Sequence, residues 1–202
     1  NKPMLRLVQG DVGAGKTLVA GVAACHVLEE GWQVALMAPT EILAEQHYLN
    51  FKKWFEPLGL SVSWLSGKQK GKARAAAEQA IVDGTAHLVV GTHALFQDNV
   101  RFAKLGLVII DEQHRFGVDQ RLALRNKGAQ NMTPHQLVMT ATPIPRTLAM
   151  SAYGDLDTSV IDELPPGRTP IQTVTIPLDR REEVLQRIAS NCLEGKQAYW
   201  VC

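Results

Sequence analysis

Cysteine, net charge and long apolar runs are all scarce in this sequence of 202 residues. The three cysteines, Cys25, Cys192 and Cys202, are an odd set without C-x-x-C spacing, which argues against a disulfide framework or a metal site and favours a reducing cytosol. No apolar run approaches membrane-spanning length, and no signal peptide is recognised. We therefore expect a cytosolic protein with no membrane contact.

The net charge is only +1, so the chain carries no overall basic field that would attract nucleic acid. Any such contact must come from cations placed locally. The hydrophobic content of 46% is ordinary for a globular protein and ample for a core at this length. The length suits one domain, or one domain with part of another.

One glycine-rich stretch matches the phosphate-binding pattern G-x-x-x-x-G-K-[ST] in full. An apolar run precedes it and a helix-forming run follows it, which is the setting that turns backbone N–H groups toward phosphates. The pattern predicts that Lys16 reaches the β- and γ-phosphates of ATP and that the Thr17 hydroxyl binds Mg²⁺. The alternative is a plain glycine-rich turn. The stretch consists of Gly10, Asp11, Val12, Gly13, Ala14, Gly15, Lys16 and Thr17.

Apolar runs alternate with helical patterns along the chain, which predicts an α/β fold with a mostly parallel sheet and helices on both faces. The active edge of such a sheet lies at the carboxyl ends of its strands. We expect strands at 4–9, 33–38, 61–65, 87–91, 106–111 and 136–140. We expect helices at 16–30, 41–55, 72–83, 118–127 and 146–152.

A proline- and glycine-rich stretch at 164–172 predicts a linker after a first domain at 1–163. Residues 173–202 fit a strand at 171–176, a helix at 180–193 and a strand at 197–202. One such unit is too small to bury a core, so we interpret it as the beginning of an incomplete second domain.

Two carboxylates, Asp111 and Glu112, follow the apolar run at 107–110. Asp111 is suited to hold Mg²⁺, directly or through water, and Glu112 to orient the water that attacks the γ-phosphate and to act as its general base. A polar strand exit into a solvated loop is the alternative, which the phosphate-binding pattern upstream disfavours.

The string Asp111-Glu112-Gln113-His114, joined to this glycine loop, resembles the superfamily 2 helicases and translocases. Longer strings narrow the resemblance to the RecG-like family. They are Asp111 to Val118, Thr140 to Leu148, Gly67 to Arg74 and Asp162 to Arg168. The Mfd-like transcription-repair coupling translocases share some of these strings and remain an alternative. A P-loop switch or binding module without motor activity is a second alternative.

The resemblance implies a RecA-like motor domain that uses ATP and Mg²⁺ to translocate on branched, double-stranded DNA, at replication forks and Holliday junctions, in repair and recombination. It implies a bacterial cytosolic, nucleoid-associated monomer whose wedge domain and second motor domain lie elsewhere in the polypeptide. The fragment alone should hydrolyse ATP poorly. Gln113 and His114 would join the catalytic set, and Thr140, Thr142 and Arg146 would couple nucleotide state to domain motion.

Several residues are candidates for DNA contact. Thr40 precedes a helix, where it is suited either to an ordinary N-cap or to a site for a DNA phosphate; the resemblance favours the phosphate. Thr92 and His93, at another strand end, are further candidates. Four cations at the start of a predicted helix oppose its dipole, which suggests an external anion, although a solvated basic loop fits equally well. They are Lys68, Lys70, Lys72 and Arg74.

Overall fold

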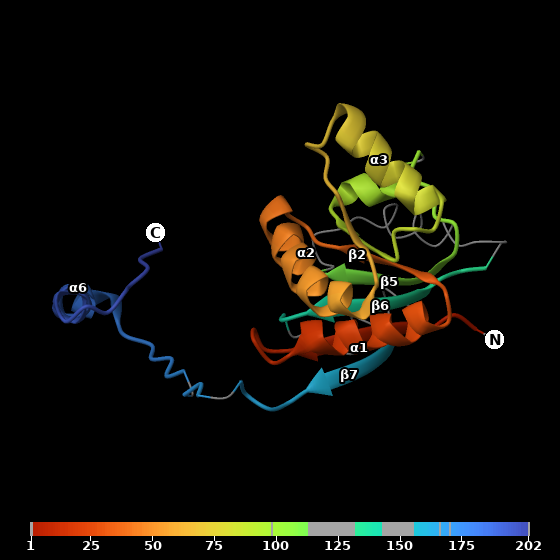
Figure 1. Ribbon diagram of the computed structural model, residues 1–202. Helices are drawn as coiled ribbons and strands as arrows, with labels where there is room; N and C mark the ends of the chain where they lie inside the picture. Colours follow the sequence, from red (N-terminus) through yellow and green to blue (C-terminus); the bar gives the residue numbers. More distant parts are fainter. Residues whose placement is uncertain are drawn as a thin grey trace. The chain divides into compact units, whose positions relative to one another are not determined.

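The computed structural model describes residues 2–97, 99–112, 132–142, 156–165, 167–169 and 171–201. The chain separates into two compact units, residues 1–166 and 167–202. Unit 1 is built on a parallel sheet with the strand order β3-β4-β2-β5-β6-β1-β7. Figure 1 labels four of these strands, β2, β5, β6 and β7. The strands are β1 (Leu5–Gly10), β2 (Gln33–Met37), β3 (Val62–Leu65), β4 (Leu88–Gly91), β5 (Leu105–Asp111), β6 (His135–Thr140) and β7 (Asp157–Ile161).

The helices of unit 1 lie on both faces of the sheet, as the sequence predicts. The alternating residues of β2 show the division: Val34 and Leu36 pack into one apolar cluster, and Ala35 and Met37 into the other. The first cluster includes α1 and α2; the second includes α3, η2 and the segment after it. The elements are α1 (Lys16–Glu29), α2 (Glu41–Phe55), η1 (Glu56–Leu58), α3 (Gly71–Val82) and η2 (His93–Phe96).

The predicted strands and helices of unit 1 agree with the structure to within a residue or so at each end wherever they fall on described residues. The predicted helices at 118–127 and 146–152 lie outside the described residues. One strand, β7, was not predicted from the sequence; it is an edge strand that, among the described strands, pairs only with β1. Its sequence, Asp-Thr-Ser-Val-Ile, begins with three polar residues and its side chains are at most half-buried, so it lacks the apolar run that marks an inner strand.

Unit 2 contains η5 (Leu178–Arg180) and α6 (Arg181–Leu193). The predicted strands at 171–176 and 197–202 are wrong as far as the structure describes them, because residues 171–177 and 196–201 form no strand. A strand needs a neighbour to accept its backbone hydrogen bonds, and these segments pair with none of the described strands. No residue of α6 is buried, in keeping with a unit too small to form its own core.

Gly91, at the end of β4, provides a test of how tightly the sheet packs. A Cβ on this residue would overlap the backbone oxygen of Leu65 in β3 and lie 3.1 Å from Cγ of Leu95. We expect Gly91→Ala to lower the free energy of unfolding of the 202-residue chain by about 1–3 kcal/mol, measured by urea denaturation. Gly67→Ala is the control, because its Cβ would meet only the exposed His93 ring, at 3.5 Å. Equal stabilities would contradict this packing.

Candidate nucleotide site at the carboxyl edge of the sheet

The glycine loop lies between β1 and α1, where the sequence pattern predicts it. Gly13 and Gly15 have φ angles of +83° and +94°, a region that side chains with a Cβ rarely enter. Gly15 is the N-cap of α1, and its carbonyl accepts from the backbone N–H groups of Leu18 and Val19. The backbone therefore makes a tight turn directly into the positive end of a helix.

Lys16 folds back over this loop. Its Nζ donates to the backbone carbonyl oxygens of Gly10 at 2.8 Å and Asp11 at 2.9 Å. These bonds hold the ammonium group at the loop, and an ammonium has a third donor besides. The lysine is thus preorganised beside the N–H groups that begin α1, as a phosphate-binding role requires.

The two carboxylates lie where β5 ends and the chain turns. Asp111 is the last residue of β5, and Glu112 follows with φ +52°. Among the described residues, Glu112 is the only one other than glycine that has a positive φ. Such a backbone conformation costs of order 1–3 kcal/mol and persists where surrounding contacts impose it. Here the backbone N–H of Glu112 donates to the carbonyl oxygen of Met139 at 2.9 Å.

The Glu112 carboxylate is held by the end of β6. Its Oε2 accepts from the Thr140 hydroxyl at 3.4 Å, and its Oε1 accepts from the backbone N–H of Ala141 at 3.3 Å. The N–H of Thr142 donates in turn to the Thr140 hydroxyl oxygen at 3.1 Å. Thr140 is therefore directly linked to the predicted catalytic carboxylate, although the coupling role of Thr140 and Thr142 stays a prediction.

The sheet order brings the loop and the carboxylates to one edge. β6 pairs with β5 on one side and with β1 on the other, all in parallel. The carboxyl ends of β1 and β5 are therefore two strand spacings apart, about 10 Å. This separation leaves room for a phosphate chain between the loop and the acidic pair.

A contact that was not predicted from the sequence joins α2 to Asp111. Nε2 of His47 lies 2.7 Å from Oδ2 of Asp111, and the two side chains are 9% and 14% exposed. The helical spacing of His47 with Leu43, Phe51 and Trp54 predicts a place in an apolar core or interface. His47 does pack edge-on against Phe51, but its ring also reaches the acidic pair. The available signal was a polar ring on the buried face of a helix that begins at the same edge of the sheet.

Thr40 and Thr92 differ in what their hydroxyl groups do. Thr40 is the N-cap of α2, and its Oγ1 accepts from the backbone N–H of Leu43 at 3.3 Å. Thr92 is buried, and its hydroxyl donates to Oε1 of Glu41 at 3.4 Å. Oε2 of Glu41 accepts from the Ser66 hydroxyl at 2.7 Å, so this one carboxylate joins the exits of β2, β3 and β4.

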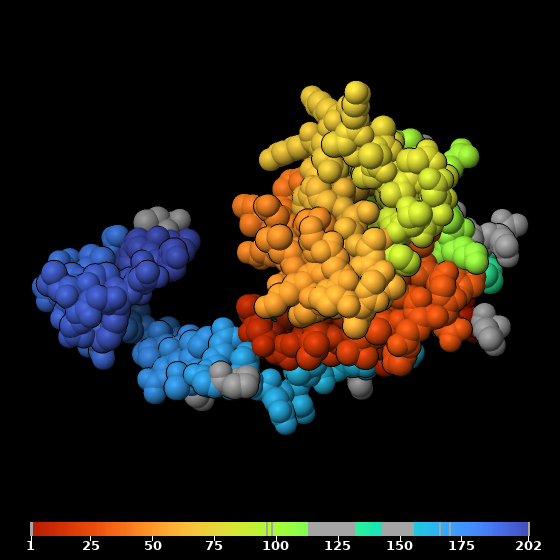
Figure 2. Space-filling view, viewed as in Figure 1, coloured from red at the N-terminus to blue at the C-terminus, as the bar shows by residue number. Residues whose placement is uncertain are grey.

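The four cations before and in α3 differ in their exposure and in their hydrogen bonds. Figure 2 shows long side chains that project from the yellow segment at the surface of unit 1. Lys68, Lys70 and Lys72 are exposed, and their ammonium groups make no bond to the described residues. His93, the other exposed candidate, lies beside Gly67.

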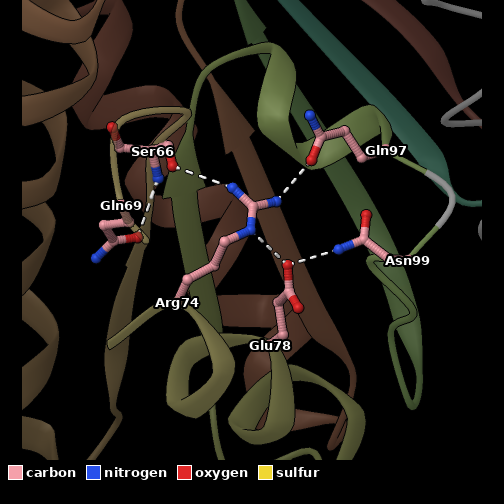
Figure 3. Close-up of polar contacts among 6 residues, drawn as sticks. All are labelled: Ser66, Gln69, Arg74, Glu78, Gln97 and Asn99. Carbon is pink, nitrogen blue, oxygen red and sulfur yellow. Dashed lines mark hydrogen bonds and ion pairs between the residues drawn. The ribbon is translucent and has the colours of Figure 1, made fainter. Parts of the chain in front are cut away.

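Arg74 is instead held inside a polar cluster (Figure 3). Its guanidinium donates to Glu78 at 2.8 Å, to the Gln97 side chain at 2.6 Å and to the carbonyl oxygen of Ser66 at 3.4 Å. Asn99 donates to the same Glu78 oxygen at 2.7 Å. The arginine therefore ties the lysine-bearing loop to α3 and to the segment after η2.

Three predicted site residues, Gln113, His114 and Arg146, lie outside the described residues. Within the described part of the chain, no three His, Cys, Asp or Glu residues cluster to hold a metal ion. The described helices also include none long and apolar enough to cross a membrane.

A parallel sheet with a phosphate-binding loop after β1 and an acidic pair at the end of β5 defines a RecA-like P-loop NTPase domain. The family described as DEAD/DEAH box helicase matches residues 3–151. The chain belongs to this family.

Several similar proteins share one name. ATP-dependent DNA helicase RecG of Escherichia coli O157:H7 is 67% identical over 202 residues, which cover 99% of this chain and 29% of that protein. The protein of the same name from Pasteurella multocida is 66% identical with the same coverage. A structure titled "Structure of RecG bound to three-way DNA junction" matches with a TM-score of 0.79 and 45% identity, over 97% of this chain and 26% of that one. The chain thus spans less than a third of the length of these relatives.

The contacts of Arg74 lead to a stability prediction. We expect Arg74→Ala to lower the free energy of unfolding by about 1–3 kcal/mol, because the partly buried Glu78 would be left without its charged hydrogen-bonding partner. Lys72→Ala is the matched control on the same helix turn and should stay within about 0.5 kcal/mol of the original chain. Urea denaturation of both variants measures the difference. If both changes proved neutral, the cluster in Figure 3 would not stabilise the fold.

Proposed function

We propose that this chain is the first motor domain of an ATP-driven translocase that acts on branched, double-stranded DNA. The observation that carries the proposal is the arrangement at the carboxyl edge of the sheet. The glycine loop with Lys16 follows β1, and the Asp111–Glu112 pair lies at the end of β5, with β6 between these two strands in the sheet. A nucleoside triphosphate bound at the loop would extend its γ-phosphate toward the carboxylates.

In this proposal the protein binds ATP through the loop and the first turn of α1. Backbone N–H groups cradle the phosphates, and the Lys16 ammonium exchanges its bonds to Gly10 and Asp11 for phosphate oxygens. Thr17 and Asp111 would hold Mg²⁺, which supplies positive charge to the phosphates. A hydroxyl and a carboxylate fit that ion, which prefers oxygen ligands and takes most of its shell from phosphates and water.

Glu112 is suited to act on the attacking water. Thr140 and Ala141 hold its carboxylate at the end of β6, and the positive φ marks a turn of the backbone directly after β5. A carboxylate held in this way can orient a water and accept its proton as the water attacks the γ-phosphate in line.

The DNA substrate is inferred from the similarity to RecG over nearly the whole chain. Because those relatives are more than three times as long, we propose that a wedge domain and a second motor domain complete the protein outside residues 1–202. Residues 1–163 would be the first motor domain, 164–172 a linker and 173–202 the entry of the second. A bacterial cytosolic monomer fits the same similarity.

The exposed lysines before and in α3 are the proposed phosphate-contact surface of this domain. Lys68, Lys70 and Lys72 project into solvent, and Arg74 supports the loop that bears them. Thr40 and His93 are further candidates on neighbouring strand ends. Thr92 could contribute through Glu41, since its own hydroxyl is already bonded there.

ATP hydrolysis by the complete protein, measured with and without a three-way or four-way DNA junction, tests the proposed function. We expect strong stimulation by the junction and weak stimulation by linear duplex. A rate that does not respond to any DNA would instead favour the alternative of a P-loop binding module without a motor role.

Substitutions of Lys16 and Glu112 should separate nucleotide binding from hydrolysis. In the complete protein, Lys16→Ala should weaken ATP binding and abolish hydrolysis, because the phosphate loop then has no ammonium group. Glu112→Gln should retain ATP binding and slow hydrolysis by about 10²–10⁴-fold, since an amide cannot accept the proton of the water. Fluorescent-nucleotide titration and phosphate release measure the two steps. Near-normal hydrolysis by Glu112→Gln would remove this residue from the proposed role.

If the lysines contact DNA phosphates, they should contribute to the salt dependence of DNA affinity. Changing Lys70 and Lys72 to Ala in the complete protein should weaken binding at low salt and flatten the log–log salt slope by about one unit for each DNA phosphate that is no longer neutralised. The weakening should be the same for different base sequences, because phosphate contacts do not read bases. ATP affinity without DNA serves as the control and should not change. An unchanged slope would mean that the lysines are only a solvated surface.

A further inference from the structure

His47 is a buried polar ring at a position where its helix otherwise presents apolar side chains to the sheet. Ala44, Phe51 and Phe55 are the other buried residues of α2, and all are apolar. His47, counted as a whole residue, is 7% exposed, and its ring packs against Phe51 with ring centroids 6.4 Å apart. Fold stability alone would be served as well by an apolar side chain of similar size.

The ring makes one hydrogen bond and leaves its other nitrogen unused. A carboxylate oxygen accepts, so Nε2–H of His47 donates to Oδ2 of Asp111 at 2.7 Å. Nδ1 is buried and has no partner among the described residues. An unsatisfied buried polar atom costs free energy, so packing alone does not favour a histidine at this position. The bond to Asp111 is the interaction that accounts for it.

The bond also gives the two carboxylate oxygens of Asp111 different surroundings. Oδ2 is occupied by His47, and Oδ1 accepts no hydrogen bond from the described residues. With the side chain only 14% exposed, the carboxylate has little freedom to rotate away from this donor. The geometry therefore leaves one defined oxygen of Asp111 without a donor among the described residues.

We propose that His47 is a positioning residue that orients the Asp111 carboxylate for Mg²⁺ in the nucleotide complex. The inference rests on the proposed function, in which Asp111 holds the metal ion. Donors that fix a ligating carboxylate influence metal affinity, typically by about 10–100-fold when they are removed. His47 acts through Asp111 and does not itself bind the ion.

The test compares variants of the complete protein in their dependence on Mg²⁺. His47→Phe keeps an aromatic ring of similar size and removes the donor, whereas His47→Gln keeps an N–H donor. The readouts are the affinity for a fluorescent ATP analogue across a Mg²⁺ titration, the same affinity in EDTA, and Mn²⁺ binding in the presence of nucleotide. ATP hydrolysis at each Mg²⁺ concentration is measured alongside.

We expect His47→Phe to raise the Mg²⁺ concentration at half-maximal nucleotide binding by about 10–100-fold and to weaken Mn²⁺ binding in proportion. Affinity in EDTA should be unchanged, and His47→Gln should recover most of the Mg²⁺ dependence. Phe51→Leu, one turn along the same buried face, is the control for packing: it should lower the melting temperature without a shift in Mg²⁺ dependence. If His47→Phe does not fold, His47→Leu removes the donor in a smaller side chain and is tested in its place.

Asp111→Asn separates the failure of this inference from the failure of the proposed function. If Asp111→Asn shifts the Mg²⁺ dependence and the donor-free His47 variants do not, His47 has no positioning role. If Asp111→Asn leaves the Mg²⁺ dependence unchanged, the proposed metal site itself is wrong. A shift of the same size in Phe51→Leu would reduce the effect of His47 to packing and would also overturn the inference.

Discussion

The parallel pairing of β1, β6 and β5 is the constraint on which the candidate site depends. In this pairing Gln9 lies opposite Thr140, and Asp111 opposite Met139, so all three strands end at nearly the same level. A slip of one residue would turn every side chain to the other face of the sheet, and both faces are buried where the apolar clusters lie. The need to bury those clusters therefore sets the positions of the polar residues that follow them.

Short polar links between neighbouring segments fix the edge of the sheet further. Glu112 is tied to Thr140, Asp111 to His47, and Glu41 to both Ser66 and Thr92. The links of Glu112 and Glu41 join strand exits to one another, and the link of Asp111 joins the exit of β5 to α2, the helix that follows β2. These hydrogen bonds restrain the side chains at the strand exits, which favours a preorganised site.

Local patterns predicted most of the helices and strands that the structure describes in unit 1. The glycine loop could be located because its spacing, its lysine and its flanking elements are all local properties of the sequence. The bounds of α2 were also predictable, since Thr40 is a good N-cap and the apolar periodicity runs to Phe55. β7 was not predictable, because an edge strand with exposed faces needs no apolar run and depends on β1 for its pairing.

The side-chain contacts of the site were harder to predict from the sequence than its location. The helical spacing of His47 with Phe51 predicts burial, but the approach of Nε2 to Asp111 depends on how α2 crosses the sheet. The predicted strands of unit 2 failed for a related reason: apolar β-prone residues at 171–176 indicate a strand only where a neighbouring strand supplies hydrogen-bond partners.

The basic cluster before α3 shows how structure distinguishes residues that sequence treats alike. Lys68, Lys70, Lys72 and Arg74 are equivalent as a run of positive charge, but only Arg74 has an acidic residue four positions further along the same helix. Its planar guanidinium can satisfy Glu78, Gln97 and Ser66 at once, which a lysine ammonium on a flexible stem is less suited to do. The arginine is therefore engaged in holding the fold. The three lysines, with no first-turn carboxylate to offset them, remain as positive charge at the amino end of the helix. A surface that concentrates positive charge in this way, on a chain whose net charge is only +1, is where an anionic partner gains most from contact.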